Sequence, residues 1–283
     1  MKLRPLEETE LHVSKNAELR PVSPWIKRGG TTLFVEDKAK PIDHVAAEQP
    51  VALVYNGVSH AVMMASPEDL EDFALGFSLT ESIIESFKDV YSLDIIEQSS
   101  GIEVQLQISQ KRFTHLKQQR RQLMGKTGCG ICGIEALQHV KPNTKPVSNQ
   151  IKVTHSSLQR ALHSLECYQT LQSLTGASHA AAWSDLKGNI KLIREDVGRH
   201  NALDKLIGAR RQSDSFTEGF VVISSRASYE MVQKASVANI EVVVAVSAAT
   251  TMAIDTADAC GVTLIGFGRS ERHVVYSGHR RIE

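Results

Sequence analysis

The segment Lys126–Gly133 combines two cysteines with three glycines and is the part of the sequence best suited to sulfur chemistry. Cys129 and Cys132 are spaced as CxxC, and they are two of only four cysteines in the chain. Glycine lacks the Cβ atom that restricts other residues, so the segment is predicted to form a mobile or tightly turned loop. A thiol pair in such a loop is accessible to a partner that donates or accepts sulfur.

The charges that precede the dithiol favour a reactive thiolate. No acidic residue lies between Glu103 and Glu135, and a predicted helix at 110–124 carries several lysines and arginines. Nearby positive charge lowers the pKa of a cysteine and so raises the fraction of nucleophilic thiolate. The same basic residues also suit a solvated helix face without any chemical role.

Three chemistries fit the CxxC pair. Structural zinc takes four Cys or His ligands, so Cys129 and Cys132 supply half a site. Disulfide exchange of the thioredoxin type places CxxC at the start of a helix after a strand, which is not its predicted context here. Persulfide carriage needs a nucleophilic thiolate on a loop that can reach both a donor and an acceptor. The residues favour persulfide carriage without excluding the other two.

The second half of the chain contains three polar turns, each following a predicted strand. In a parallel α/β sheet such turns meet at the carboxyl ends of the strands, where unpaired backbone N–H groups favour anions. Each turn taken singly also suits plain helix capping by Ser or Thr. Their convergence, with two arginines in the last turn, predicts a phosphate-bearing ligand. The turns are Ser224–Ser228, Ser247–Thr251 and Phe267–Arg272.

The densest polar cluster is Glu195–Asn201, at a predicted strand-to-helix junction. Arg199 and His200 are candidate ligand-binding residues there, and His179 is a third candidate. The plainer interpretation makes Asp196 an acid of the first helical turn, with Arg199 as its partner and the histidines structural.

The first half of the sequence predicts a strand-rich unit. Asn56-Gly57 is typical of a type I′ turn, so the residues from Val51 to Met64 are predicted to form a β-hairpin. Ser66 is predicted to cap a helix that runs to about Ile84. Strands at 90–96 and 102–108, the helix at 110–124 and a proline-containing connector at 138–152 follow.

The second half predicts an α/β unit with a parallel sheet, because strands and helices alternate closely. The predicted organisation is an N-terminal arm at 1–35, a strand-rich domain at 36–137 and an α/β domain at 138–283. The expected helices span 156–171, 199–210, 228–238 and 249–259, and the expected strands span 177–183, 189–194, 219–224, 241–247 and 262–267.

Composition sets the broad class. The 283 residues are 42% hydrophobic and 23% charged, with 32 basic and 32 acidic side chains. This balance argues against a dedicated nucleic-acid or membrane-surface protein. No apolar signal segment or membrane span is predicted, and the isolated Cys167 and Cys260 argue against a disulfide framework. We therefore expect a cytoplasmic protein, and we predict no resident metal.

Five motifs together resemble the FdhD family of formate dehydrogenase accessory proteins, which are sulfurtransferases of molybdenum-cofactor maturation. The resemblance extends from about Pro50 to Tyr276. The motifs are Pro50–Gly57, Asp72–Phe77, Thr127–Gly133, Glu195–Lys205 and Ser224–Glu230.

The resemblance implies a cytoplasmic homodimer that takes persulfide sulfur from a cysteine desulfurase and passes it to the molybdenum bis(guanine dinucleotide) cofactor before insertion into formate dehydrogenase. It also implies a larger domain similar to cytidine deaminase, a three-layer α/β/α domain, beside a smaller strand-rich domain. The zinc deaminase signature is absent after His179, so deaminase chemistry is not expected.

The resemblance also assigns residues. Cys129 matches the persulfide-bearing cysteine and Cys132 its supporting thiol. The segment Phe267–Arg272 matches the cofactor-binding position, although it lacks the cysteine and proline that some relatives carry there. A non-catalytic cofactor chaperone and a thiol-disulfide oxidoreductase are the alternative functions. The predicted cofactor-binding set is Phe267, Gly268, Arg269, Ser270, Glu271, Arg272, Ser225, Arg226, Ser228, Arg199 and His200.

Overall fold

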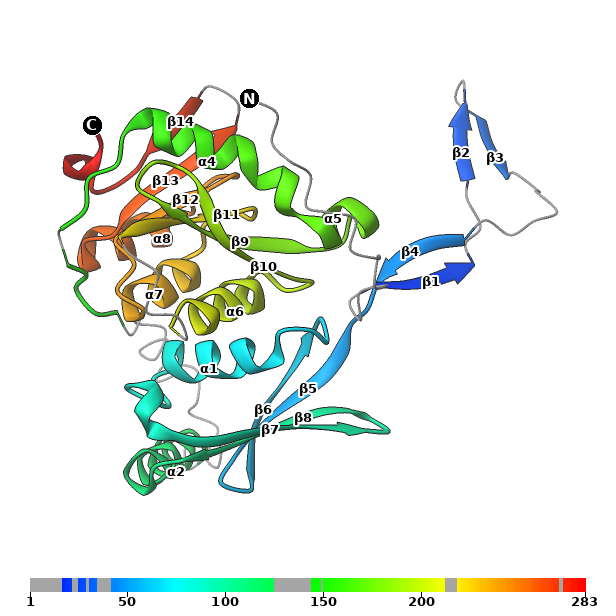
Figure 1. Cartoon of the computed structure of the whole chain (residues 1–283), viewed down its shortest axis with the longest axis vertical. Coiled ribbons are helices and arrows are strands. Elements are labelled where there is room, and N and C mark those ends of the chain that lie inside the picture. The colour runs from blue at the N-terminus through cyan, green and yellow to red at the C-terminus, as the bar shows by residue number, and fades with distance from the viewer. Residues whose placement is uncertain are drawn as a thin grey trace, which may run out of the picture.

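The computed structural model describes residues 17–21, 25–28, 31–34, 42–124, 144–148, 150–211, 218–269 and 272–283. Two sheets dominate the fold, and helices lie between them (Figure 1). Two short antiparallel pairs precede the first sheet. They join β1 (Ala17–Pro21) to β4 (Ile42–Ala46), and β2 (Trp25–Arg28) to β3 (Thr31–Phe34).

The N-terminal sheet has the strand order β6-β5-β8-β7. Its β5–β6 hairpin turns at Asn56 (φ 47°) and Gly57 (φ 77°), so both turn residues are left-handed, as a type I′ turn requires. This confirms the predicted hairpin, and the predicted strand pair after it is also present. The strands are β5 (Gln49–Tyr55), β6 (Val58–Ala65), β7 (Val90–Gln98) and β8 (Gly101–Ile108).

Helix α1 (Leu70–Thr80) covers the core face of this sheet, and α2 (Gln110–Met124) confirms the second predicted helix. The prediction that Ser66 caps α1 is wrong. The N-cap is Asp69, in a left-handed conformation at φ 55° and without a side-chain cap. Ser66 is instead fully buried, because its polar groups bond to the second half of the chain.

The C-terminal sheet has the strand order β10-β9-β11-β12-β13-β14. The predicted parallel sheet is mixed: β11, β12 and β13 run parallel, and the other pairings are antiparallel. Only four residues separate β9 from β10 and two separate β13 from β14, and connections that short permit only antiparallel pairing. The strands are β9 (His179–Asp185), β10 (Ile190–Asp196), β11 (Gly219–Ile223), β12 (Val242–Ala245), β13 (Thr263–Arg269) and β14 (Arg272–Val275).

Helices cover both faces of this sheet, which confirms the expected three-layer α/β/α domain. Alternate residues of β12 show it: Val242 and Val244 pack with α4, whereas Val243 and Ala245 join the core that contains α6, α7 and α8. Strands buried on both faces read as continuous apolar runs. The helices are α4 (His155–Tyr168), α5 (Thr170–Thr175), α6 (Arg199–Arg211), α7 (Tyr229–Val237) and α8 (Thr251–Cys260).

Helices α1 and α6 bring the two sheets into one continuous core (Figure 1). Two glycines permit the close crossing. A Cβ atom on Gly76 would lie 1.8 Å from the Asp204 carbonyl oxygen, and one on Gly208 would lie 2.0 Å from that of Asp72. The predicted domain boundary at 137–138 lies outside the described residues.

Buried polar groups also join the two halves. The Asp196 carboxylate accepts the Ser66 backbone N–H at 3.0 Å and pairs with Lys205 Nζ at 2.8 Å. Lys205 also donates to the Ser66 carbonyl, and both charged side chains are 0% exposed. A second group of buried polar contacts joins the halves at α1. Lys234 Nζ pairs with Asp204 at 2.9 Å, and the Thr80 hydroxyl donates to Asp204 and accepts from Lys234.

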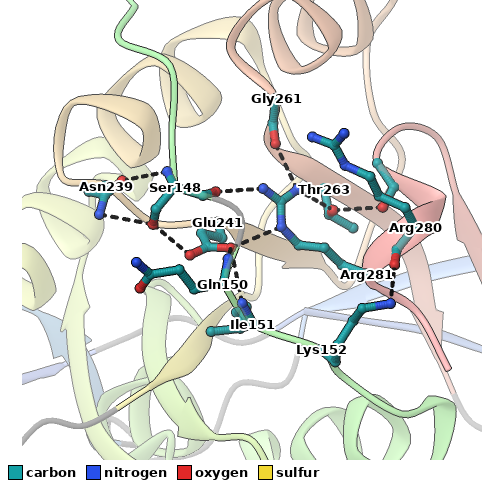
Figure 2. A network of polar contacts seen from close by, with 11 residues as sticks. Ser148, Gln150, Ile151, Lys152, Asn239, Glu241, Gly261, Thr263, Arg280 and Arg281 are labelled. Carbon is teal, nitrogen blue, oxygen red and sulfur yellow. Dashed lines mark hydrogen bonds and ion pairs between the residues drawn. The ribbon is translucent and has the colours of Figure 1, made fainter.

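The amino edge of the C-terminal sheet is closed by one buried ion pair (Figure 2). Arg281 Nε donates to Glu241 Oε2 at 2.9 Å, and Arg281 is 1% exposed. The remaining guanidinium nitrogens donate to the carbonyls of Ser148 and Gly261 and to the Thr263 hydroxyl. Glu241 accepts three further hydrogen bonds, so the pair has its hydrogen-bonding groups well satisfied.

No helix within the described ranges combines the length and the apolar character that crossing a membrane requires.

Candidate functional site

The opposite, carboxyl edge of the C-terminal sheet gathers the predicted site residues of the second half. The parallel strands β11, β12 and β13 end there, and their antiparallel neighbours β9 and β14 begin there. The β10 strand also ends at this edge, at Asp196, directly before Arg199 and His200. The expected convergence of the three polar turns is therefore confirmed.

A pocket of about 1070 Å³ opens at this edge, between the strand ends and the second half of α4. We refer to it as the α4 pocket. Its volume lies just above the range of about 300–1,000 Å³ that is typical of small-molecule sites. The pocket offers imidazole, carboxylate, amide and hydroxyl groups beside the apolar side of α4. Its lining residues include Leu162, His163, Glu166, Cys167, Gln172, Ser178, His179, Ser224, Val246 and Gly268.

Glu195 fixes the wall that α5 contributes to the α4 pocket. Its carboxylate accepts the backbone N–H groups of Leu171 at 2.8 Å and Gln172 at 2.9 Å, and the Ser178 hydroxyl at 2.8 Å. A carboxylate on the first N–H groups of a helix satisfies donors that have no partner within the helix. Glu195 was part of the polar cluster in the sequence, but nothing there indicated this positioning role.

The predicted segment Phe267–Arg272 contains the last three residues of β13 and the first residue of β14, two strands that pair antiparallel. The element that follows β13 is thus an antiparallel edge strand and not a helix. Phe267 is 38% exposed and has a left-handed backbone at φ 52°. Ser270 and Glu271 lie outside the described residues.

Gly268 is the residue of this segment that lines the α4 pocket. A Cβ atom there would lie 2.5 Å from Leu162 Cδ2, so glycine lets α4 approach the end of the sheet closely. Arg269 ends β13 and pairs in register with Arg272, the first residue of β14. Arg272 lines a second hollow next to the first, together with His155, Ser156, Gln159 and His273.

The predicted residues Ser225, Arg226 and Ser228 lie between β11 and α7 and are not part of the α4 pocket lining. Ser225 is buried and its hydroxyl donates to the Arg226 carbonyl at 3.0 Å. Ser228 is the N-cap residue of α7, and its hydroxyl donates to Glu230 Oε2 at 3.2 Å. The turn Ser247–Thr251 lies beside them and includes Thr250, which caps α8.

Arg199 is the first residue of α6, and its Nε atom is buried without a hydrogen-bond partner in the described part of the chain. An unpaired buried donor costs about 1–3 kcal/mol. The Arg199 Nε donor is thus unused within the described residues. Burial lowers the pKa of His179, and the positive charge of Arg199 lowers it further, against a smaller opposing effect of Asp196.

His200 follows Arg199 and lies 3.0 Å, Nε2 to Oε2, from Glu230. Burial lowers the pKa of His200, the charge of Glu230 acts against this, and Arg199 adds to the lowering. Glu230 also accepts the Ser228 hydroxyl, so it holds two predicted site residues together. The sequence analysis included Glu230 in a motif but gave it no role.

Four further residues of the polar motif are structural. Asp196 and Lys205 form the buried pair described above, and Asp204 bonds to Thr80 and Lys234. Asn201 donates to Asp196 and to the carbonyl of Met64. The interpretation of Asp196 as the partner of Arg199 is therefore wrong.

Cys129 and Cys132 lie outside the described residues, so their roles stay predictions. The described chain stops at the end of α2 and resumes at Thr144. Figure 1 shows α2 and α4 on opposite sides of the molecule. Within the described ranges, no three His, Cys, Asp or Glu side chains come together in a way that could hold a metal ion.

Comparison with known proteins agrees with this architecture. A solved structure, described as that of a candidate formate dehydrogenase accessory protein from Desulfotalea psychrophila, superposes with a TM-score of 0.69. The match covers 94% of this chain and 99% of that protein at 19% sequence identity, so it shows the fold. The model of the FdhD/NarQ family matches residues 46–283, a range that includes both sheets and the whole carboxyl edge. The chain therefore belongs to the FdhD/NarQ family.

Proposed function

We propose that the protein is a sulfurtransferase of formate dehydrogenase maturation. In this proposal it carries persulfide sulfur from a cysteine desulfurase to the molybdenum bis(guanine dinucleotide) cofactor. Membership of the FdhD/NarQ family and the fold shared with a formate dehydrogenase accessory protein support it. The observation that carries the proposal is the α4 pocket, at the edge where the predicted ligand-binding turns meet.

The sulfur chemistry is assigned to the dithiol. The Cys129 thiolate attacks the terminal sulfur of the donor persulfide; the donor S–S bond breaks, and the donor cysteine leaves as a thiolate. Cys129 then carries the sulfur as a persulfide. Attack of the Cys132 thiolate on Cys129 Sγ forms a disulfide and releases the terminal sulfur as hydrosulfide. Oxidation of the Cys129–Cys132 dithiol to the disulfide thereby supplies the two electrons that convert sulfane sulfur into sulfide for the molybdenum centre, and an external thiol reduces the disulfide before the next cycle.

The acceptor is assigned to the carboxyl edge. Pterin and guanine rings suit the apolar α4 side of the pocket, and Arg199, Arg226 and Arg272 offer positive charge for phosphates along the same edge. Arg226 is exposed, as is Arg272, so both guanidinium groups are accessible to a ligand.

The proposal also includes a cytoplasmic homodimer. Size-exclusion chromatography with light scattering measures the molar mass in solution and so tests the dimer.

Mass spectrometry after incubation with a cysteine desulfurase and cysteine tests the sulfur step. We expect one added sulfur atom on Cys129, and the exposed Cys167 serves as an internal control that stays unmodified. In the Cys132→Ala protein the adduct should persist, and hydrosulfide should be released only after an external thiol is added. A Cys129→Ala protein that still carries the sulfur, or still supports active formate dehydrogenase, contradicts the assignment.

Guanosine diphosphate, a fragment of the cofactor, tests the acceptor step. A ligand at 100 times its Kd stabilises a folded protein by about 2.7 kcal/mol, so saturating nucleotide should raise the melting temperature. Arg272→Ala should reduce this shift, because it removes a cation from the edge. The absence of any shift with the nucleotide and with the whole cofactor would remove the proposed binding site. A shift without any persulfide on Cys129 would favour the alternative function, a non-catalytic cofactor chaperone.

A further inference from the structure

Helix α2 exposes a face whose charges are all of one sign. Its buried side consists of Arg112, Phe113 and Leu116, which recur at helical spacing, and the two apolar residues join the core of the N-terminal sheet. The exposed side includes Lys111 and Lys117, and no acidic residue occurs anywhere in the helix. We use the name basic face of α2 for the exposed residues Gln110, Lys111, Thr114, His115, Lys117 and Gln118.

Arg112 is the one cation of this part of α2 that the fold itself uses. Its Nε atom donates to the Ile83 carbonyl at 2.8 Å, Nη1 pairs with Glu85 Oε1 at 2.7 Å, and Nη2 donates to the Ser82 carbonyl. The Arg112 side chain is only 6% exposed. These contacts fix α2 to the segment that follows α1, so the basic face has a rigid support.

The two exposed lysines have no such structural role. In the part of the chain that the structure describes, neither Lys111 nor Lys117 has an ion-pair partner. Lys117 Nζ lies 4.2 Å from the centroid of the Phe113 ring, which holds the side chain against the helix. Solvated helix faces gain stability from opposite charges at i and i+4, whereas like charges at that spacing destabilise a helix. Lys117 is followed at i+4 by Arg121, so this charge pattern favours binding over helix stability.

The basic face lies close to the dithiol along the chain. Helix α2 ends at Met124, five residues before Cys129. Five residues span at most about 18 Å, so any donor that reaches Cys129 comes within about that distance of the helix end. Lys117 lies about 10 Å back along the helix from Met124. A standard protein interface buries about 800 Å² on each partner, a patch of about 16 Å radius. A protein-sized donor at Cys129 therefore reaches the basic face.

We propose that the basic face of α2 is the docking surface for the sulfur donor protein, and that it recognises an acidic patch beside the donor's persulfide. The inference rests on the proposed function and deepens it, because it states where the donor binds. The chain has 32 basic and 32 acidic residues and no net charge, so the molecule as a whole does not attract a polyanion such as nucleic acid. A protein with a complementary local patch fits this distribution. Complementary charges act mainly on the association rate.

Charge reversal tests the docking surface. The Lys111→Glu/Lys117→Glu protein should associate with the cysteine desulfurase about tenfold more slowly at low ionic strength, and the rate should depend less on salt. Stopped-flow fluorescence measures both. Persulfide loading of Cys129 should slow by the same factor at low donor concentration and recover when the donor is saturating. Lys111→Gln/Lys117→Gln removes the charges without adding acids and should give an intermediate loss.

The matched control is Lys187→Glu/Arg280→Glu. It changes the net charge by the same amount at two exposed positions of the C-terminal half. The control should change the association rate by less than about twofold, because charges beyond a Debye length of an interface are largely screened. The melting temperature of each variant shows whether its fold is retained. A control that slows association as much as the α2 reversal contradicts the docking surface.

The lysines could instead act on the dithiol by lowering the pKa of Cys129, and alkylation separates the two roles. Iodoacetamide is small and uncharged, so its rate of reaction at Cys129 reports the thiolate alone. Mass spectrometry resolves Cys129 from the exposed Cys167. We expect the α2 reversal to leave the alkylation rate of Cys129 within about twofold of its original value. If alkylation slows as much as persulfide loading does, the lysines tune the thiol and the docking surface is wrong.

The remaining outcomes separate this inference from the proposed function. If the reversed protein is loaded by the desulfurase as fast as the unchanged protein, the docking surface is wrong and the sulfurtransferase stands. If the desulfurase binds through the basic face but never loads Cys129, the docking surface stands and the sulfur step fails. If duplex DNA binds as tightly as the desulfurase at the same salt concentration, and the reversal abolishes both, the face attracts any polyanion and the proposal is wrong.

Discussion

The two edges of the C-terminal sheet use arginine in opposite ways. At the amino edge, Arg281 is buried and all three of its guanidinium nitrogens have acceptors, among them Glu241 (Figure 2). At the carboxyl edge, the buried Arg199 Nε atom has no partner among the described residues, and Arg226 and Arg272 are exposed. The same side chain therefore completes the fold at one edge and stays available at the other.

The difference shows how a binding edge can be recognised without a bound ligand. Buried polar groups in folded proteins are nearly always paired, so a buried donor without a partner indicates a missing acceptor. The amino edge meets this requirement with residues of the chain itself. At the carboxyl edge the Arg199 Nε donor has no acceptor among the described residues, and the pocket and the hollow open there.

The largest effect is expected from breaking the amino edge. Arg281→Met leaves Glu241 buried without its charged partner, and removing one member of a buried ion pair typically costs about 3–5 kcal/mol. The free energy of unfolding, measured by urea denaturation, should fall by that amount. Arg280→Met changes the exposed neighbour and should have little effect. If Arg281→Met and Arg280→Met lower the free energy of unfolding equally, the structural role assigned to Arg281 is contradicted.

The matching change at the carboxyl edge should affect binding instead of folding. Arg199→Met removes a buried donor that has no partner in the described part of the chain, so the free energy of unfolding should not fall and should increase by up to about 1–3 kcal/mol. The melting-temperature shift produced by guanosine diphosphate should become smaller. A large loss of stability with an unchanged nucleotide shift would reverse the contrast between the edges.

The smallest effect concerns acid stability at the amino edge. Burial tends to raise the pKa of Glu241, but hydrogen bonds from Ser148, Gln150, Ile151 and Arg281 outweigh it and hold the pKa below its usual value. Because the folded-state pKa is depressed, this carboxylate adds stability above its unfolded pKa, about 4.3. That stability is lost as the pH falls through the folded-state pKa. The stability of Glu241→Gln, measured by denaturation between pH 5 and 3, should depend less on pH than that of the unchanged protein.

The sequence predicted local elements well, because their signals are local. Asn56-Gly57 determined the hairpin turn, and the alternation of apolar strands and helices predicted an α/β unit, whose three layers the family resemblance implied. The carboxyl edge was also predictable, since parallel strands bring their ends together. The direction of β14 was not, because two residues between strands carry no signal for the pairing that follows.

Partners distant in sequence account for most of what was missed. Ser66 matched a helix cap by spacing, yet its partners are Asp196 and Lys205, 130 and 139 residues away. The motif Glu195–Lys205 combined ligand-binding candidates with residues that join the two sheets, and spacing alone does not separate them. The wall of α4 was missed because an amphipathic helix gives no indication that a pocket lies along it.

The close crossing of α1 and α6 has a consequence for protein engineering. Gly76 and Gly208 allow backbone contact, and the buried Asp196–Lys205 pair bonds to Ser66 across the same junction. The two sheets are therefore not interchangeable modules. A chimera that joins the N-terminal sheet of one family member to the C-terminal sheet of another should fold only when both parents match at these five positions. Recombination sites are better placed within surface turns of a single sheet.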